Sequence, residues 1–291
     1  MKIVNLDGYT TNPGDLSWDW LGNYGEYKVY DRTAPEQIVE RAKGADILII
    51  NKSVITAQML ENLPNLKFVG LQSTGYNVID CKAARARNIT VSNIPAYSTT
   101  GVAQLVFAFI LQVADNVSLH SDAVHNGEWC ECPDFCFWKT PLTELDGKTI
   151  GIIGFGSIGR RVAQIANAFG MNVEVFTTHP KPDEYKNVNF VDFDTLLSDS
   201  DFITCHCPLT EKTENLIDKN AIDKMRKNAV VINTSRGPVV NDEDLADALN
   251  SGKIKAAGVD VLRVEPPEKE NPLLHAKNCY ITPHIAWAAY E

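Results

Sequence analysis

Short apolar runs alternate with helical patterns along the first hundred residues. We expect five of these runs to be strands: Lys2–Leu6, Tyr27–Tyr30, Ile47–Ile50, Phe68–Leu71 and Thr90–Ser92. Apolar residues at three- and four-residue spacing lie between several of them and predict helices, for example at Pro35–Lys43 and Thr56–Asn62. This alternation predicts a parallel sheet with helices on both faces.

The second half of the chain shows the same alternation after a long apolar segment. Ser98 to about His125 is predicted to be one helix, and Val102–Val113 is apolar on nearly every face, so we expect it to be buried between domains or subunits. The loop Gly127–Pro141 is rich in Trp, Phe, Cys and Pro and has no period. The later predicted strands are Thr149–Ile153, Asn172–Phe176, Phe202–Cys205, Ala229–Asn233, Ala256–Asp260 and Tyr280–Thr282, and the predicted helices include Lys219–Arg226 and Asp242–Ser251.

The stretch Lys148–Thr178 carries the fingerprint of a dinucleotide site. Its first strand runs directly into Gly154-Phe155-Gly156-Ser157-Ile158-Gly159, after which apolar residues recur at helical spacing. In such a turn the first glycine permits the tight bend, the second lets the backbone approach a pyrophosphate, and the third lets the helix pack closely. The phosphates would bind N–H groups at the N-terminus of the helix.

Composition and charge argue against several kinds of partner. The chain has 291 residues, enough for two domains, and its 44% of apolar and 22% of charged residues are those of a globular protein. The net charge of −10 leaves no basic surplus for nucleic acid or an anionic membrane. No apolar run approaches the ~20 residues that cross a bilayer, and the N-terminus does not resemble a signal peptide.

The seven cysteines are an odd number scattered over a long chain, which indicates reduced thiols and a cytoplasmic location. Cys130, Cys132 and Cys136 lie close enough in sequence to suggest metal ligation. They form no C-x-x-C pair, and no second group of ligands accompanies them. We therefore expect no metal site.

Residues with suitable chemistry follow three predicted strands of the second half. Arg236, Glu265 and His284 would reach the carboxyl edge of the sheet, where doubly wound sheets bind their ligands. Arginine offers a planar fork for a carboxylate, and histidine can pass a proton near neutrality. A carboxylate beside the histidine favours its protonated form. Each residue alone could be structural or solvated, but together with the glycine fingerprint they favour an oxidoreductase site.

The motifs that hold these residues resemble those of the D-2-hydroxyacid dehydrogenase family. Arg236 lies in NTSRGPVV, Glu265 in GVDVLRVEPP and His284 in ITPHIAW, and the resemblance extends through PNLKFVGLQSTGYNVID and HCPLTEKTENLID over almost the whole chain. STGYNVID and NIPAYSTTGVAQ look most like glycerate dehydrogenases, which act as hydroxypyruvate reductases. The resemblance implies reversible reduction of a small 2-keto acid, hydroxypyruvate or glyoxylate, to the D-2-hydroxy acid with NAD(P)H.

The resemblance also implies an α/β fold of two doubly wound parallel-sheet domains, with a Rossmann cofactor domain inserted in a flavodoxin-like substrate domain. Residues 1–96, joined by 287–291, would form the substrate domain, and residues 97–286 the NAD(P)-binding domain. The active site would lie between them, and a homodimer would form on the cofactor domain. Family members continue into a helix that returns to the first domain, whereas this chain ends at Glu291, so we expect that domain to be less well covered.

Roles for single residues follow from the resemblance. Arg236 would clamp the substrate carboxylate, His284 would donate a proton to the keto oxygen, and Glu265 would hydrogen-bond His284. Backbone amides of Ser73, Thr74 and Gly75 would bind the substrate from the other domain. The remaining residues would contact the cofactor: Gly154, Gly156, Ser157, Ile158 and Gly159 at the pyrophosphate, Cys207 and Pro208 on the adenosine side, Thr234 at the nicotinamide ribose, and Asp260 at the carboxamide.

One position departs from the pattern of NAD enzymes. The second strand of such a domain usually ends in Asp or Glu, which binds the ribose hydroxyls of NAD. Here Thr177 takes that place, and no carboxylate lies in Thr177–Lys181. Lys181 or His179 could attract a 2′-phosphate, while threonine can still bond a free hydroxyl. We expect relaxed cofactor choice, with NADPH used at least appreciably.

Two alternatives stay open. A D-lactate or phosphoglycerate-type dehydrogenase of the same family would differ only in details of the pocket. A non-catalytic nucleotide-sensing protein on the same fold is disfavoured by the complete set of Arg236, Glu265 and His284.

Overall fold

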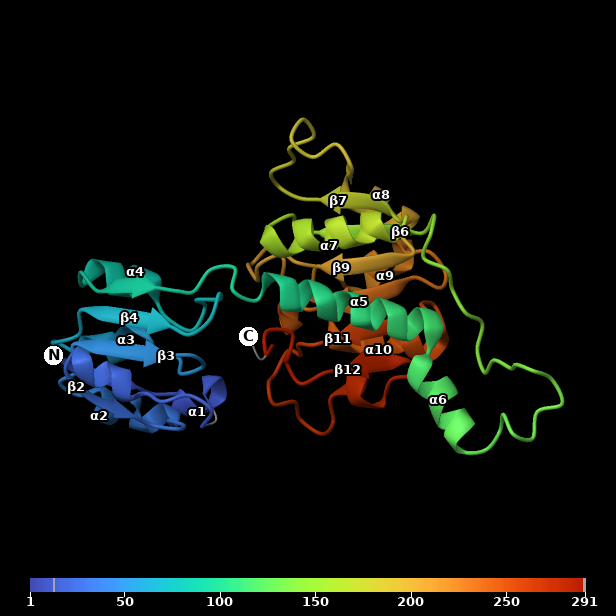
Figure 1. The fold of residues 1–291 in the computed structure, drawn as a ribbon. Coiled ribbons are helices and arrows are strands. Elements are labelled where there is room, and N and C mark those ends of the chain that lie inside the picture. The colour runs from blue at the N-terminus through green and yellow to red at the C-terminus, as the bar shows by residue number, and fades with distance from the viewer. Residues whose placement is uncertain (13, 290–291) are drawn as a thin grey trace. The chain divides into compact units, whose positions relative to one another are not determined.

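The computed structural model describes residues 1–12 and 14–289 of the chain. The chain divides into two compact units, Met1–Tyr97 and Ser98–Glu291. Each unit has its own parallel sheet and its own buried core (Figure 1). The expectation that residues 287–291 join the first domain stays a prediction, because residues 290 and 291 lie outside the described residues.

The first unit has a five-stranded parallel sheet in the order β2-β1-β3-β4-β5. This is the strand order of flavodoxin-like doubly wound sheets. Its strands are β1 (Lys2–Asn5), β2 (Glu26–Val29), β3 (Ile47–Ile50), β4 (Phe68–Leu71) and β5 (Thr90–Ser92). Its helices are α1 (Gly8–Thr11), η1 (Asp19–Asn23), η2 (Pro35–Gln37), α2 (Ile38–Ala42), α3 (Ala57–Glu61) and α4 (Cys81–Ala86).

The second unit has a seven-stranded parallel sheet in the order β12-β11-β10-β9-β6-β7-β8. Chain order reverses between β6 and β9, as in a Rossmann sheet, so the ends of these strands form the switch point where such folds bind dinucleotides. The strands are β6 (Thr149–Ile153), β7 (Asn172–Phe176), β8 (Asn189–Phe190), β9 (Phe202–Cys205), β10 (Val230–Asn233), β11 (Ala256–Val259) and β12 (Cys279–Ile281). The prediction of two doubly wound parallel sheets is confirmed.

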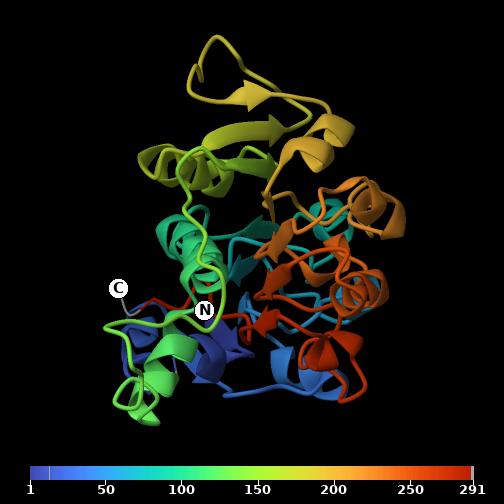
Figure 2. The same ribbon diagram turned by 90° about the vertical axis from the view of Figure 1, so that its right-hand side faces the viewer.

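Helices cover both faces of the second sheet (Figure 2). The green helices α5 (Thr99–Asp115) and α7 (Ser157–Ala168) pack on one face, and the gold to orange helices α8 (Phe193–Asp199), α9 (Lys219–Lys224) and α10 (Asp242–Ser251) on the other. Alternate strand residues supply the two cores: Ile152 contributes to the first and Ile153 to the second. Short segments η3 (Gly237–Val239) and η4 (Pro272–His275) complete the unit.

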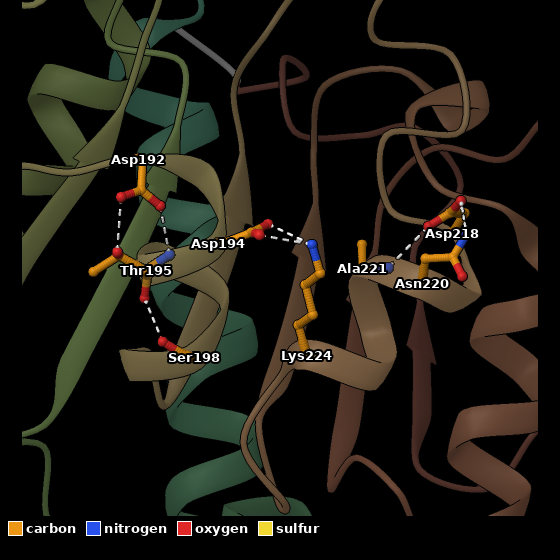
Figure 3. Close-up of polar contacts among 8 residues, drawn as sticks. All are labelled: Asp192, Asp194, Thr195, Ser198, Asp218, Asn220, Ala221 and Lys224. Carbon is orange, nitrogen blue, oxygen red and sulfur yellow. Dashed lines mark hydrogen bonds and ion pairs between the residues drawn. The ribbon is translucent and has the colours of Figure 1, made fainter.

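Capping side chains fix the short helices α8 and α9 (Figure 3). Asp192 accepts a hydrogen bond from the Thr195 N–H at 2.8 Å, and Asp218 accepts one from the Ala221 N–H at 2.9 Å. An exposed ion pair between Lys224 and Asp194, 2.7 Å long, links the two helices. Helix α8, of seven residues, was not predicted from the sequence.

The prediction of one helix from Ser98 to His125 is wrong. The structure has two helices, α5 and α6 (Val117–His125), separated at Asn116 and bent by 55°. Asn116 is in the left-handed conformation with φ 49°, and its side chain bonds Thr140 and Tyr280. Among the described residues no single helix is long and apolar enough to cross a membrane, and only the bent pair passes that test by length and composition.

Candidate active site

Three neighbouring strands of the second sheet bring three of the predicted site residues to one edge. Arg236 follows β10, Asp260 directly follows β11, and His284 follows β12. Because these strands are adjacent and parallel, their carboxyl ends open on the same side of the sheet (Figure 1). The polar residues at these ends therefore gather at the edge that doubly wound sheets use for ligands.

A buried carboxylate organises the turn that carries the histidine. Asp260 is 1% exposed, and its Oδ1 accepts hydrogen bonds from the Thr282 hydroxyl at 2.6 Å and the Ile285 N–H at 2.8 Å. Its Oδ2 accepts one from the Ala286 N–H at 2.9 Å. These bonds span His284, whose φ of 55° is in the left-handed region, where a side chain is uncommon. Asp260 thus fixes the chain before and after His284, whose backbone conformation is strained.

The imidazole of His284 meets the carboxylate of Glu265. His284 Nδ1 lies 2.6 Å from Glu265 Oε2, with both side chains about 30% exposed. Glu265 Oε1 also accepts a hydrogen bond from the Leu262 N–H at 3.2 Å, so the carboxylate is fixed from its own loop. Since Nδ1 faces Glu265, Nε2 is the ring nitrogen left for a ligand. The predicted contact between these two residues is present in the structure.

The turn that carries Arg236 is fixed by Asn233. The Asn233 side chain accepts bonds from Ser235 N–H (3.1 Å) and hydroxyl (2.8 Å), and it donates to the Arg236 carbonyl at 2.9 Å. The next residue, Gly237, lies so close to the backbone of Leu262 that a Cβ would clash with it. This close approach joins the arginine turn to the loop that leads to Glu265.

The glycine-rich turn has the shape that a pyrophosphate requires. A Cβ on Gly154 would lie 2.8 Å from the backbone of His206 and Cys207, and one on Gly159 would clash with the Gly154 carbonyl. Gly156 instead faces open space, and it caps α7 without a side-chain bond to the first-turn N–H groups. Ser157 and Ile158 begin that helix. Close packing at two glycines and an open face at the third fit a dinucleotide.

The loop that begins at His206 lies against the glycine-rich turn. The His206 N–H donates to the Ile153 carbonyl at 2.7 Å, which places Cys207 and Pro208 beside that turn. Burial raises the pKa of the Cys207 thiol to about 11. At the end of β10, the Thr234 hydroxyl is buried without a partner among the described residues. A bound ligand at this edge could supply the hydrogen-bond partner that this buried hydroxyl lacks.

No carboxylate ends the second Rossmann strand. The Thr177 hydroxyl accepts a bond from the His179 N–H at 3.4 Å, and the Thr178 hydroxyl lies 2.9 Å from His179 Nδ1. Lys181 pairs with Glu184 a few residues later. The sequence analysis did not identify Glu184 of this loop, because it lies outside the motif.

The Ser73–Gly75 loop belongs to the first unit, after β4. The Ser73 hydroxyl donates to the Gly75 carbonyl at 2.7 Å, and the Ile94 N–H donates to the Ser73 carbonyl at 3.0 Å. The Thr74 hydroxyl donates to the Ile94 carbonyl at 3.0 Å. These bonds give the loop a defined shape. Its role toward the same substrate as Arg236 stays a prediction.

The cysteine-rich loop holds free thiols. Cys130 and Cys136 are exposed, and the Cys132 thiol lies 3.8 Å from the Cys136 carbonyl. Within residues 1–12 and 14–289, no group of three or more His, Cys, Asp or Glu side chains could hold a metal ion.

Sequence reasoning missed two residues that hold the site together, Thr282 and Asn233. An asparagine at a strand end often bonds the backbone of a following turn, and that signal could have identified Asn233. The bond from Thr282 to Asp260 joins two strands and leaves no local signal.

Comparison with known proteins places the chain in a family. The family model described as D-isomer specific 2-hydroxyacid dehydrogenase, NAD binding domain, matches residues 107–286. A hydroxypyruvate reductase of Blautia hydrogenotrophica is 48% identical over 295 residues, which cover 100% of this chain and 92% of that protein. The chain belongs to the D-isomer specific 2-hydroxyacid dehydrogenase family.

Solved structures agree with this assignment. An acyclic imino acid reductase in complex with NADPH and D-Arg superposes with a TM-score of 0.88 and 32% identity, over 100% of this chain and 92% of the other. D-Lactate dehydrogenase from Aquifex aeolicus, complexed with NAD and lactic acid, gives a TM-score of 0.88 and 28% identity, over 100% and 90%. One of these relatives is thus described with NADPH and the other with NAD.

The enclosed ring of His206 makes stability depend on pH. Its Nδ1 is buried without a described partner, its Nε2 lies 2.9 Å from the Thr204 hydroxyl, and burial lowers the pKa to about 3 from its usual 6.5. Between these two pH values His206 is protonated in the unfolded chain and neutral in the folded chain. The free energy of unfolding therefore rises with pH in this range. His206 alone should change the free energy of unfolding by up to about 1.4 kcal/mol per pH unit in this range.

Urea unfolding of the wild type and of His206→Gln between pH 4 and 7 measures this slope. We expect the variant to lose part of the acid sensitivity of the wild type. Parallel pH dependences of the two proteins would contradict the burial of a neutral imidazole.

Proposed function

We propose that this chain is an NAD(P)-dependent oxidoreductase that reversibly reduces a small 2-keto acid to the D-2-hydroxy acid. The observation that carries the proposal is the contact of 2.6 Å between His284 and Glu265, at the strand edge that also bears Arg236. A histidine held in one orientation by a carboxylate is suited to general acid–base work. Membership of the dehydrogenase family supports this chemistry.

Each catalytic residue has one task in this reaction. Arg236 binds the substrate carboxylate through its planar fork and so orients the 2-keto group. His284 Nε2, the ring nitrogen away from Glu265, gives its proton to the keto oxygen. A nicotinamide nucleotide, when bound, would supply the hydride for the reduction. Glu265 stabilises the imidazolium before the transfer and keeps the ring oriented after it.

Hydroxypyruvate or glyoxylate is the proposed substrate. The Blautia hydrogenotrophica relative, which this chain matches along its whole length, bears the name hydroxypyruvate reductase. The amides of Ser73, Thr74 and Gly75 would bind the substrate carboxylate from the first unit. Pyruvate is the comparison substrate, because the related D-lactate dehydrogenase was solved with lactic acid.

The proposed cofactors are NADH and NADPH, with relaxed preference. Thr177 and Thr178 stand where a carboxylate would repel a 2′-phosphate, and neither adds charge. The glycine-rich turn, Cys207, Pro208, Thr234 and Asp260 would hold the remaining parts of the nucleotide. Asp260 uses three of about four lone-pair directions on its own turn, so one is left for the carboxamide.

A second copy of this chain is the proposed partner at an exposed apolar surface of the second unit. Helix α6 and the loop after it expose Val117, Phe135, Trp138 and Leu142, with Phe135 89% exposed. Val117, Trp138 and Leu142 help to line a hollow of about 360 Å³. Apolar patches of this kind mark association surfaces. A homodimer on the cofactor domain would cover it.

A reducing compartment such as the cytoplasm is the proposed location. All seven cysteines are free in the structure, and five of them are buried or partly buried. Unpaired thiols in this number are typical of reducing compartments.

The variants His284→Ala and Arg236→Ala test the catalytic assignment. We expect each to lower kcat/KM for hydroxypyruvate by at least ~100-fold, because the first removes the proton donor and the second the carboxylate clamp. His275→Ala and Arg161→Ala, which remove an exposed histidine and an exposed arginine of the same unit, serve as controls. Oxidation of NADPH and NADH is measured with hydroxypyruvate, glyoxylate and pyruvate in parallel.

Turnover within a few-fold of wild type in His284→Ala would exclude the proposed proton donor. Failure of the wild-type protein with all three acids, while nucleotide still binds, would favour a nucleotide-sensing protein.

The oligomeric state tests the apolar surface. We expect a dimer at micromolar concentration by gel filtration with light scattering, and a shift toward monomer in Trp138→Ser, because this change removes apolar area from the patch. Trp20→Ser alters an exposed tryptophan of the first unit and should leave the dimer intact. A monomeric wild type would contradict the proposal.

A further inference from the structure

The segment after β7 folds back onto the glycine-rich turn. The Lys181 carbonyl accepts hydrogen bonds from the N–H groups of Glu184 (3.1 Å) and Tyr185 (3.2 Å), which closes a turn. The ring of Tyr185 meets Phe155 of the glycine-rich turn edge-on, with centroids 5.1 Å apart. Phe155 packs in the same way against Phe190, at 5.6 Å. These contacts hold Lys181 and Glu184 beside the turn assigned to the pyrophosphate.

Three charged side chains gather at this place. Lys181 Nζ lies 2.9 Å from Glu184 Oε2, and this hydrogen bond raises the pKa of Lys181 and lowers that of Glu184. Arg160, on the first turn of α7, is close enough for its positive charge to lower the pKa of both groups slightly. Its guanidinium donates to two neutral oxygens, the Phe155 carbonyl (3.4 Å) and the Ser157 hydroxyl (3.5 Å). The arginine charge is thus not neutralised by a carboxylate through these bonds.

We propose that Arg160 and Lys181 recognise the 2′-phosphate of NADPH, and that Glu184 limits this recognition by holding Lys181. The inference rests on the proposed function, since it assumes that this edge binds a nicotinamide nucleotide. It assigns the cofactor preference to three charged residues that lie outside the glycine motif, in addition to Thr177.

The chemistry of the three groups explains how both cofactors are accepted. Arginine presents a fork of donors that matches phosphate oxygens, and lysine is a point charge on a flexible stem. Lys181 and Glu184 are 63% and 52% exposed, and exposed ion pairs of this kind are weak. Lys181 can therefore turn from Glu184 to a phosphate dianion. When the ribose carries a free hydroxyl, the Lys181–Glu184 pair persists, and the uncharged Thr177 hydroxyl stands at the strand end.

Glu184 also places a negative charge near the phosphate. Because the side chains are exposed, salt screens their interactions, and the preference for the 2′-phosphate should fall as ionic strength rises. Removing Glu184 should act twice, since it frees Lys181 and takes away a repulsive charge.

Binding of adenosine 2′,5′-bisphosphate, measured by calorimetry against 5′-AMP, tests this inference without turnover. We expect Glu184→Gln to tighten the bisphosphate about fivefold, and Lys181→Gln and Arg160→Gln to weaken it about fivefold or more, as for the loss of one exposed charge contact. Asp183→Asn is the matched control, because it removes one negative charge from the same exposed loop without touching the pair. It should change the affinity less than twofold.

Three results would overturn the inference. Equal tightening in Glu184→Gln and Asp183→Asn would reduce the effect to general charge. Unchanged bisphosphate affinity in Glu184→Gln would remove the limiting role of Glu184. Unchanged affinity in both Lys181→Gln and Arg160→Gln would place the 2′-phosphate elsewhere.

Kinetics with hydroxypyruvate separate this inference from the proposed function. The wild type should use NADPH and NADH with kcat/KM values within about 100-fold of each other, and Glu184→Gln should move the ratio about fivefold toward NADPH. Expected binding results without reduction of any 2-keto acid would contradict the reaction and leave the 2′-phosphate site standing. If the enzyme reduces a 2-keto acid but the ratio of NADPH to NADH use is the same in all variants, the 2′-phosphate site would be contradicted and the reaction would stand.

Discussion

The bonds that Asp260 makes to the turn after β12 are the constraint on which the site depends. One carboxylate, 1% exposed, accepts bonds from Thr282, Ile285 and Ala286 and so fixes the backbone on both sides of His284. A non-glycine residue at φ 55° persists only where its surroundings hold it there. The histidine is therefore oriented by the fold before any ligand binds, and Glu265 fixes its ring.

The sheet of the second unit places this constrained turn beside the other residues of the site. Because β10, β11 and β12 are neighbours, the arginine, the aspartate and the histidine leave the sheet at one edge. The glycine-rich turn after β6 opens at the same edge, beside the reversal of strand order. In the proposed function, proton transfer, carboxylate binding and nucleotide binding would all depend on one buried parallel sheet, and cofactor choice would depend on exposed charges next to it.

Much of this arrangement could be predicted from the sequence, because strand cores and strand ends leave local signals. Ile47–Ile50 and Phe202–Cys205 were predicted to the residue, since each is a short apolar run between polar neighbours. The break at Asn116 was not, because the hydrogen-bond partners of its side chain lie 24 and 164 residues away. The donors to Asp260 lie 22 to 26 residues later, so the sequence placed this residue at the edge without identifying what it holds.

The most direct test of this account is kcat for 2-keto acid reduction in Asp260→Asn, measured with the amide exchange of Ile285 and Ala286. The amide side chain turns one acceptor into a donor that faces the turn, which leaves buried N–H groups unpaired. The account predicts faster exchange at both amides and a kcat at least ~10-fold lower, because His284 loses its fixed orientation. Faster exchange with kcat within twofold of wild type would contradict it.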